Sequence, residues 1–252
     1  MATYVLVHGA FHGAWCWKKL IPLLEAAGHP VFAPSLTGLA ERANLLTPEV
    51  GLSTHIQDIV QVIQNHHLED VILVGHSQGA MVITGVVDRI PEHVGHLVYL
   101  DTFVPKDGES MADIAPLVIR VFRREARLHG DGWRVYPPRG LATGLGVTQE
   151  PDKSWVNAMV TPQSLKTFEE HLHLRNPDIV SLEPCTHILC TGDRMRNIMR
   201  NILFRRALPP TGPNWRSRRL QTGHGCMITM PRELADLLLE IADPVNVKKP
   251  SL

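Results

Sequence analysis

The stretch ILVGHSQGAM, residues 72–81, is the most informative segment of this chain. An apolar run from Val71 to Val74 ends at Gly75, and Ser77 stands between that glycine and Gly79. The run predicts a buried strand, and the residues from Gly79 onward predict a helix. A serine in a Gly-x-Ser-x-Gly turn between strand and helix is typical of a nucleophile elbow, which exposes the hydroxyl at the helix N-terminus. Because short patterns also occur by chance, a nucleophilic Ser77 depends on partners elsewhere in the chain.

Strand-like runs alternate with helical segments on both sides of this turn. Strands are expected at 4–7, 30–35, 70–75, 96–101, 187–192 and 218–223, and helices at 15–27, 54–66, 79–90 and 231–242. Strands that are apolar throughout favour a parallel sheet covered on both faces. The expected fold class is therefore α/β, with a mostly parallel sheet and helices on both of its faces.

This alternation is lost between Phe103 and Glu183, in a region rich in Pro, Gly and Arg. Such a segment is too long to be a loop in a compact domain. We expect residues 104–183 to form a mainly helical cap, or lid, inserted after the strand that ends near Asp101. Residues 1–103 and 184–252 would then form the core, and the cap would lie at the sheet edge where ligands of open α/β sheets bind.

A serine nucleophile needs a base, and the base needs an acid to orient it. His224 lies between two glycines after the last expected strand and is the candidate base. Two aspartates, Asp193 and Asp101, each follow an expected strand. Asp193 is favoured because the order of such triads is serine, acid, histidine and the acid usually follows the strand after the cap. Asp101 is the alternative acid, or a residue that anchors the cap.

An oxyanion hole requires two backbone N–H groups. One is expected from Gln78, the residue after the candidate nucleophile. The other is expected from the glycine-rich loop after the first strand, where Ala10 follows His8 and Gly9 and Phe11 is the nearby alternative. Gly9 would let the backbone approach the substrate, and His8 would orient the loop by hydrogen bonding.

Composition narrows the function classes. Lys plus Arg and Asp plus Glu each number 25, so the zero formal charge gives no reason to expect nucleic acid or an acidic membrane surface as a partner. No apolar run approaches the ~20 residues that span a bilayer, and the N-terminus lacks the basic region of a signal peptide. The four cysteines show neither CxxC nor a metal-like spacing with histidine. We expect a cytoplasmic monomer or homodimer that needs no metal or organic cofactor and acts on a small molecule.

Several segments carry a family resemblance. Four of them resemble the α/β-hydrolase branch that contains the plant methylesterases and hydroxynitrile lyases: VLVHGAFHGAWCWKKLIPLLEAAGH, ILVGHSQGAM, LCTGD and TGHGCM. Two more, SLTGLAERANLLTPEVGLSTHIQDI and YLDTFVPKDGES, are similar to bacterial carboxylesterases of that branch, including the pyrethroid hydrolases. The resemblance covers the core and implies an α/β-hydrolase fold with Ser77, Asp193 and His224 as the triad. LCTGD supports Asp193, since it is similar to the segment that bears the acid in the plant members.

The resemblance also separates two chemistries. Lyases of this branch carry a threonine in the first loop and a lysine directly after the catalytic histidine, where this chain has Gly9 and Gly225. Both glycines favour ester hydrolysis. The expected function is a serine carboxylesterase that hydrolyses hydrophobic carboxylic esters, pyrethroid-like esters among them, through an acyl-enzyme. The alternatives are a hydroxynitrile lyase-type C–C lyase and a non-catalytic ligand-binding protein of the same fold.

Overall fold

A six-stranded parallel sheet organises the molecule in the computed structural model, which describes residues 1–192 and 212–243. Its strands lie side by side in the order β2-β1-β3-β4-β7-β8. In chain order they are β1 (Tyr4–Val7), β2 (Val31–Phe32), β3 (Val71–His76), β4 (Val94–Leu100), β7 (Cys185–Cys190) and β8 (Trp215–Leu220). The α/β fold class with a parallel sheet, predicted from the apolar strands, is confirmed.

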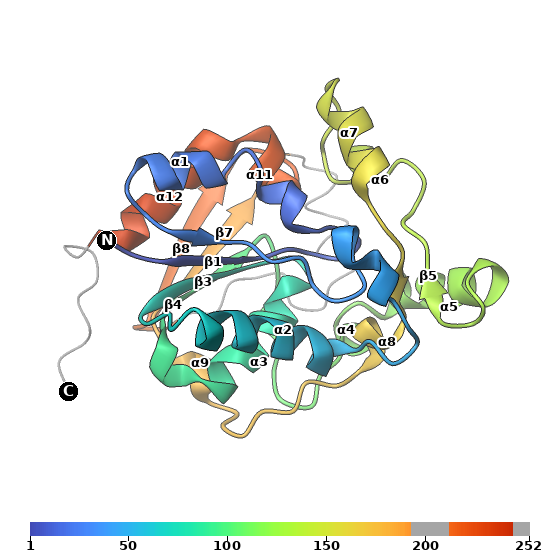
Figure 1. Ribbon diagram of the computed structural model, residues 1–252, viewed down its shortest axis with the longest axis horizontal. Helices are drawn as coiled ribbons and strands as arrows, with labels where there is room; N and C mark the ends of the chain where they lie inside the picture. The colour runs from blue at the N-terminus through green and yellow to red at the C-terminus, as the bar shows by residue number, and fades with distance from the viewer. Residues whose placement is uncertain (193–211, 244–252) are drawn as a thin grey trace.

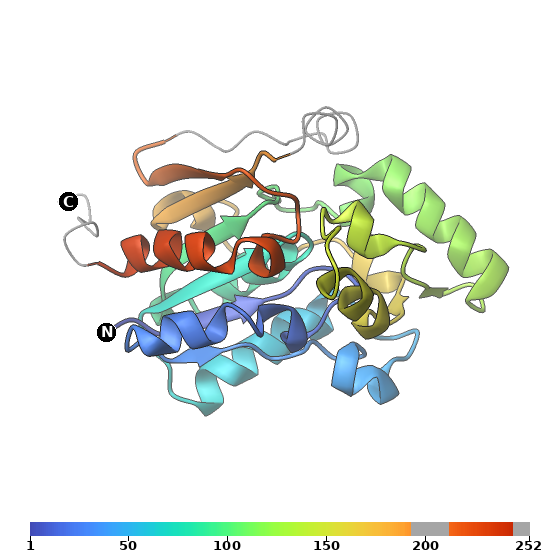
Figure 2. The same ribbon diagram turned by 90° about the horizontal axis from the view of Figure 1, so that it is seen from above.

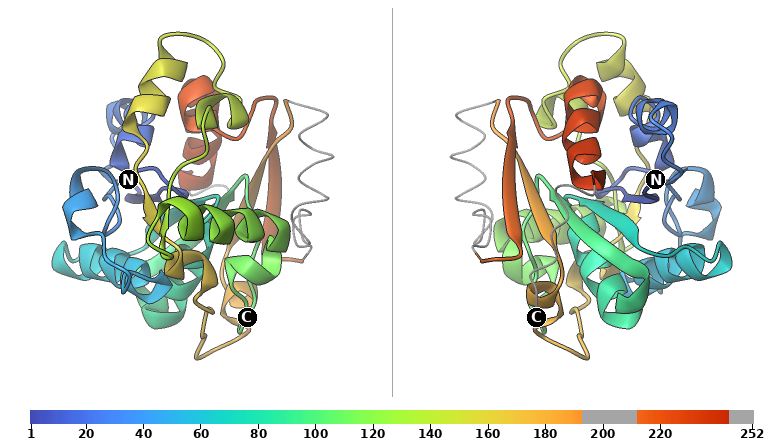
Figure 3. Two further views of the ribbon diagram at one scale, coloured as in Figure 1. Left: turned by 90° about the vertical axis from the view of Figure 1, so that its right-hand side faces the viewer. Right: turned by 90° about the vertical axis from the view of Figure 1, so that its left-hand side faces the viewer.

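Helices cover both faces of the sheet (Figure 1). One face carries α2 (Leu52–Asn65) and α3 (Gly79–Arg89), and the other carries α1 (Ile21–Ala26), α11 (Cys226–Thr229) and α12 (Pro231–Ala242). The end views of Figure 3 show the sheet passing between these two helical layers. The described residues also contain the short 3₁₀ helices η1 (Ala14–Trp17), η2 (Ala40–Leu45) and η3 (Pro91–His93).

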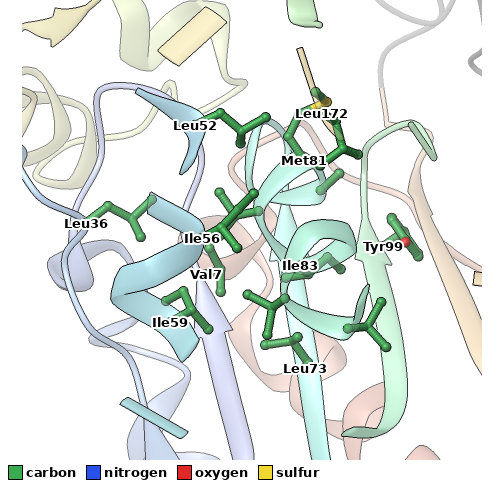
Figure 4. Close-up of a cluster of buried hydrophobic side chains, with 14 of the residues drawn as sticks. Val7, Leu36, Leu52, Ile56, Ile59, Leu73, Met81, Ile83, Tyr99 and Leu172 are labelled. Atoms are coloured by element: carbon green, nitrogen blue, oxygen red, sulfur yellow. The ribbon is translucent and has the colours of Figure 1, made fainter. Parts of the chain in front are cut away.

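Strands β1 and β3 are buried along their whole length because successive side chains enter opposite hydrophobic clusters. On β1, Val5 and Val7 join the cluster under α2 and α3, whereas Tyr4 and Leu6 join the cluster under α1 and α12. Figure 4 shows part of the first cluster, in which Ile56 of α2 packs toward the sheet and α3. Complete burial of such a side chain contributes about 1.5–3 kcal/mol to stability, so the two clusters hold the layers together.

Residues between β4 and β7 form the inserted segment, most of which gathers at the end of the sheet opposite the N-terminus (Figure 2). Its last helix, Ile179–Leu182, lies instead beside α3 (Figure 1). The helices of the inserted segment are α4 (Met111–Ile114), α5 (Pro116–His129), α6 (Leu141–Gly144), α7 (Asp152–Met159), α8 (Lys166–Glu169) and α9 (Ile179–Leu182). A short antiparallel pair, β5 (Arg134–Val135) and β6 (Gln163–Ser164), lies among them. The segment supplies buried side chains to both clusters, for example Phe168 to one and Val156 to the other, so it shares its core with the sheet.

Some element boundaries differ from the sequence expectation. The helix expected over 15–27 is divided into η1 and α1, with Pro22 in the first turn of α1, where its missing N–H is tolerated. The strand expected over 30–35 pairs with β1 only at Val31 and Phe32. Helix α2 begins at Leu52 rather than Thr54, because the Thr54 hydroxyl accepts a hydrogen bond from the Gly51 N–H (3.2 Å) and closes the first turn. Within the described residues, no helix is both long and apolar enough to cross a membrane.

Candidate active site

Ser77 occupies a tight turn between β3 and α3. Its φ of +53° lies in the left-handed region, which a residue with a Cβ rarely adopts. The neighbouring glycines permit this turn: a Cβ on Gly75 would lie 2.8 Å from the Gly79 carbonyl oxygen, and one on Gly79 would lie 2.7 Å from the Val7 carbonyl oxygen. Real Cβ atoms do not approach backbone this closely. The strand, helix and glycines therefore build the elbow geometry that the Gly-x-Ser-x-Gly pattern predicts.

His224 follows β8 and lies beside the residue that precedes the serine. Its ring centroid is 4.4 Å from that of His76, and His76 Nε2 is 2.9 Å from the His224 carbonyl oxygen. Nδ1 of His224 is 2.6 Å from Oδ2 of Asp101. A carboxylate at Nδ1 keeps the proton on that nitrogen and leaves Nε2 unprotonated, which is the tautomer a general base requires.

Asp101 is well placed to hold the imidazole. It directly follows β4, its side chain is 7% exposed, and its Oδ1 accepts a hydrogen bond from the Cys190 N–H (2.9 Å). One carboxylate oxygen is thus fixed by the end of β7 while the other faces His224. The structure brings the alternative acid Asp101 to the histidine. Asp193, the residue favoured from the sequence, lies outside the described residues.

The Ser77 hydroxyl and Nε2 of His224 are the atoms that would react with a substrate. Among the described residues, neither the Ser77 hydroxyl nor Nε2 of His224 makes a hydrogen bond. Hydrogen bonds between nucleophile and base are often long without substrate and shorten in the complex. Both atoms are therefore free to engage a substrate.

The loop after β1 lies directly against the nucleophile. A Cβ on Gly9 would be 2.9 Å from the Ser77 Cβ, so only glycine fits at this position without displacement. Of the expected oxyanion donors, the Phe11 N–H donates to Oε1 of Gln163 at 2.8 Å. The N–H groups of Ala10 and Gln78 have no acceptor in the described part of the chain. These two amides are therefore the ones available to a substrate oxygen.

Three buried histidines surround this loop in neutral form. His8 accepts a hydrogen bond from the Leu36 N–H at Nε2, which leaves Nδ1 to donate to the Gly9 carbonyl (2.9 Å). Nδ1 of His12 is 2.7 Å from the Ala10 carbonyl oxygen. Burial lowers the pKa of His8 to about 3 and of His12 to about 4, and it lowers the pKa of His76 well below its ordinary value. At neutral pH these imidazoles orient backbone groups without adding charge, as the sequence suggested for His8.

Sequence reasoning missed Gln163, and it assigned no role to His12 or His76. Gln163 comes from the inserted segment, far along the chain from the loop it contacts, and no local pattern marks it. Its pairing with Phe11 follows from tertiary packing alone.

Gly225, the second position that separates the lyases from the esterases, faces the inserted segment. A Cβ at this position would lie 2.8 Å from Cγ2 of Val147, and the Gly225 N–H donates to the Leu145 carbonyl (2.8 Å). A larger side chain here would displace that segment.

In the described residues, no group of three or more His, Cys, Asp or Glu side chains is arranged to hold a metal ion.

The sequence pattern of the alpha/beta hydrolase family matches residues 4–237. The chain belongs to the alpha/beta hydrolase family. Within that family it is similar to the carbendazim hydrolyzing esterase of Nocardioides sp. (strain SG-4G), with 36% identity over 94% of this chain and 98% of the relative. It is also similar to methylesterase 10 of Arabidopsis thaliana, with 27% identity over 96% of this chain and 92% of that protein.

Among solved structures, an extracellular alpha/beta-hydrolase from a Paenibacillus species superimposes with a TM-score of 0.77. Its sequence identity to this chain is 23%, and the match covers 95% of this chain and 98% of that one. At this identity the likeness concerns the fold. It confirms the α/β-hydrolase fold that the sequence resemblance implied.

Proposed function

We propose that the chain is a serine carboxylesterase that acts through a Ser77–His224–Asp101 triad. The observation that carries the proposal is the 2.6 Å contact between Nδ1 of His224 and the buried Asp101, beside a serine on a strained elbow. A base with an oriented imidazole and a partly buried serine hydroxyl on an adjacent turn are the components of nucleophilic acyl transfer. The names of the two esterase relatives support the same reaction class.

The reaction has two halves. Nε2 of His224 removes the Ser77 proton while Oγ attacks the ester carbonyl carbon, and the N–H groups of Ala10 and Gln78 stabilise the resulting oxyanion. Collapse of this intermediate breaks the bond to the alcohol oxygen, which receives the proton from His224. Water then attacks the acyl-enzyme and gives a proton to Nε2 of His224. Collapse of this second intermediate breaks the bond between the acyl carbon and Ser77 Oγ, which takes the proton back from His224 as the carboxylic acid leaves. Asp101 stabilises the imidazolium that forms in each half.

A hydrophobic ester is the proposed substrate class. The loop that carries Ala10 continues into Phe11, whose ring packs against Phe122 and Phe168 with centroid distances of 5.4 and 5.9 Å. This apolar cluster adjoins the proposed oxyanion hole and suits an apolar acyl or alcohol group. Pyrethroid-type esters and small methyl esters are the candidates to compare.

Two observations favour hydrolysis over the lyase and binding alternatives. Gly9 has no room for a threonine side chain beside Ser77, and Gly225 has no room for a lysine beside Val147. A non-catalytic binding protein has no need for free oxyanion donors next to a strained serine.

We also propose that residues 104–183 form the lid of the site. We further propose a reducing compartment such as the cytoplasm, because the four cysteines show no CxxC or other spacing typical of a disulfide framework.

The test is hydrolysis of a panel of p-nitrophenyl, methyl and pyrethroid-type esters, with carbendazim included, and cleavage of mandelonitrile as the lyase assay. Wild type should hydrolyse esters, and Ser77→Ala should lower kcat about 10⁴-fold or more. Asp101→Asn should lower kcat about 10²- to 10⁴-fold, because the imidazole loses its orienting charge, whereas Asp193→Asn should stay within about threefold. Undiminished turnover in Ser77→Ala would remove the nucleophile assignment. The opposite ranking of the two aspartate variants would transfer the acid role to Asp193.

A further inference from the structure

Gln163 connects the two segments that flank the proposed oxyanion hole. It belongs to β6 of the inserted segment and is 1% exposed. Its Oε1 accepts from the Phe11 N–H (2.8 Å), and its Nε2 donates to Oε1 of Gln78 (2.7 Å) and to the Thr167 hydroxyl (2.8 Å). Both N–H groups of the Gln163 amide therefore donate hydrogen bonds. Since the Phe11 N–H can only donate, the oxygen of Gln163 must face it, which fixes the orientation of the amide.

On one side, Gln163 holds the backbone that contains Ala10. The peptide group between Ala10 and Phe11 is fixed at both ends, because its N–H donates to Gln163 and its carbonyl faces Nδ1 of His12 (2.7 Å). Phe11 has a φ of +64°, a conformation that the contact with Gln163 helps to maintain. With the Phe11 N–H occupied, the Ala10 N–H is the donor of this loop that remains for an oxyanion.

On the other side, Gln163 holds the residue after the nucleophile. Gln78 is 5% exposed, and besides the contact of its Oε1 with Gln163 its Nε2 donates to the Thr167 carbonyl (2.9 Å). The Gln78 backbone N–H is the second proposed donor. A single buried amide therefore contacts both donor-bearing segments, and these segments come from different loops of the core.

We propose that Gln163 is a positioning residue that sets the relative placement of the Ala10 and Gln78 N–H groups, a proposal that rests on the esterase function above. Oxyanion donors act through preorganised geometry, and small displacements reduce their effect on the transition state more than on the ground state. The inserted segment thereby contributes to the catalytic geometry of the core through a residue that does not touch the substrate.

The experiment compares Gln163→Met, which keeps the length and removes both the donor and the acceptor functions, with Gln163→Asn, whose amide is too short to reach Phe11 and Gln78 together. Each should lower kcat about 10- to 100-fold with KM within about threefold, since the lost stabilisation belongs to the transition state. Affinity for a trifluoromethyl ketone, whose adduct with Ser77 carries an oxyanion, should fall by a similar factor. The matched control is Ser164→Ala, since Ser164 is the adjacent buried residue of β6 and its hydroxyl faces the Pro48 carbonyl, away from this loop. It should keep the wild-type kcat.

The possible outcomes distinguish a failure of the proposed Gln163 role from a failure of the proposed esterase function. A folded Gln163→Met enzyme with the wild-type kcat, or one with a lower Tm and unchanged kcat and inhibitor affinity, would show a purely structural role and overturn the proposal. Should Gln163→Met fail to fold, Gln163→Asn decides by the same readouts. A wild-type protein that neither hydrolyses any ester nor reacts at Ser77 with a fluorophosphonate would overturn the esterase function and this inference with it.

Discussion

Three residues of the candidate site share a backbone conformation that is uncommon for residues with a side chain. Phe11, Ser77 and Asp101 have φ values of +64°, +53° and +45°. Each such residue costs about 1–3 kcal/mol and persists only where its surroundings hold it. The Ser77 carbonyl accepts from the Thr102 hydroxyl (2.6 Å), and the Asp101 N–H donates to the Ile188 carbonyl (2.7 Å). Three of the seven non-glycine residues with positive φ in the described part of the chain therefore lie at the proposed site.

Gly9 provides the sharpest test of this local geometry. Gly9→Ala places a Cβ against the Ser77 Cβ, so either the loop or the nucleophile must shift by several tenths of an ångström. We expect kcat/KM for a p-nitrophenyl ester to fall about 100-fold while the protein remains folded. Steady-state kinetics together with circular dichroism would measure both effects.

The matched control for this substitution is Gly144→Ala in α6, where an added Cβ meets no atom within 4 Å. This variant should keep kcat/KM within about twofold, because alanine suits a helix and nothing must move. Equal activity of the two variants would mean that the loop after β1 accommodates a side chain and that its close approach to Ser77 is not required.

At the scale of elements, the sequence predicted the strands, turns and helices that are encoded by a pattern of neighbouring residues. Strand β3, the elbow and helix α12 follow from apolar runs, a glycine pattern and helical periodicity. The choice of acid could not be predicted in this way. Asp101 and Asp193 each follow a strand of the sheet, and which one faces His224 depends on how the strand ends converge in space. Here Asp101 contacts the end of β7, and this contact aims its carboxylate toward the loop after β8.

A buried carboxylate helps to attach the inserted segment to α3. Asp88 lies in the last turn of α3, where the helix dipole disfavours negative charge, yet it is buried. Its two oxygens accept hydrogen bonds from the N–H groups of Arg175 and Asn176, both at 2.9 Å. These contacts explain why an acidic residue is found at an otherwise unfavourable position.

Removing this carboxylate should loosen the connection between the helix and the returning chain. Asp88→Ala leaves two backbone N–H groups without their charged acceptor, so we expect the free energy of unfolding to fall by about 2–4 kcal/mol. Urea denaturation at pH 7.5 would measure it. Asp236→Ala, at an exposed position of α12, should change the same quantity by less than about 0.5 kcal/mol. A neutral Asp88→Ala would show that solvent satisfies these amides and that the segment is held by its apolar contacts.

At the scale of the whole molecule, the inserted segment and the sheet share their hydrophobic clusters, and buried neutral histidines are distributed through this common core. Burial lowers the pKa of His8 to about 3 and the pKa values of His12 and His96 to about 4. In the unfolded chain these imidazoles return to a pKa of about 6.5. Between that value and the folded-state pKa values, the unfolded chain binds more protons than the folded one, so the free energy of unfolding decreases as the pH falls.

Stability should therefore be maximal near neutrality and decline below about pH 6.5. Each of the three histidines is expected to remove about 2 kcal/mol from the free energy of unfolding between pH 7.5 and pH 5, since one pKa unit corresponds to about 1.4 kcal/mol. Urea denaturation at pH 7.5, 6.0 and 5.0 measures this loss.

His96 offers an internal control because it lies on β4, where its Nε2 is 2.9 Å from the Thr186 hydroxyl oxygen. His96→Gln removes one titrating group and should reduce the pH-dependent loss by about 2 kcal/mol. A stability that stays constant from pH 7.5 to 5.0 in both proteins would mean that these imidazoles accept protons without unfolding the core.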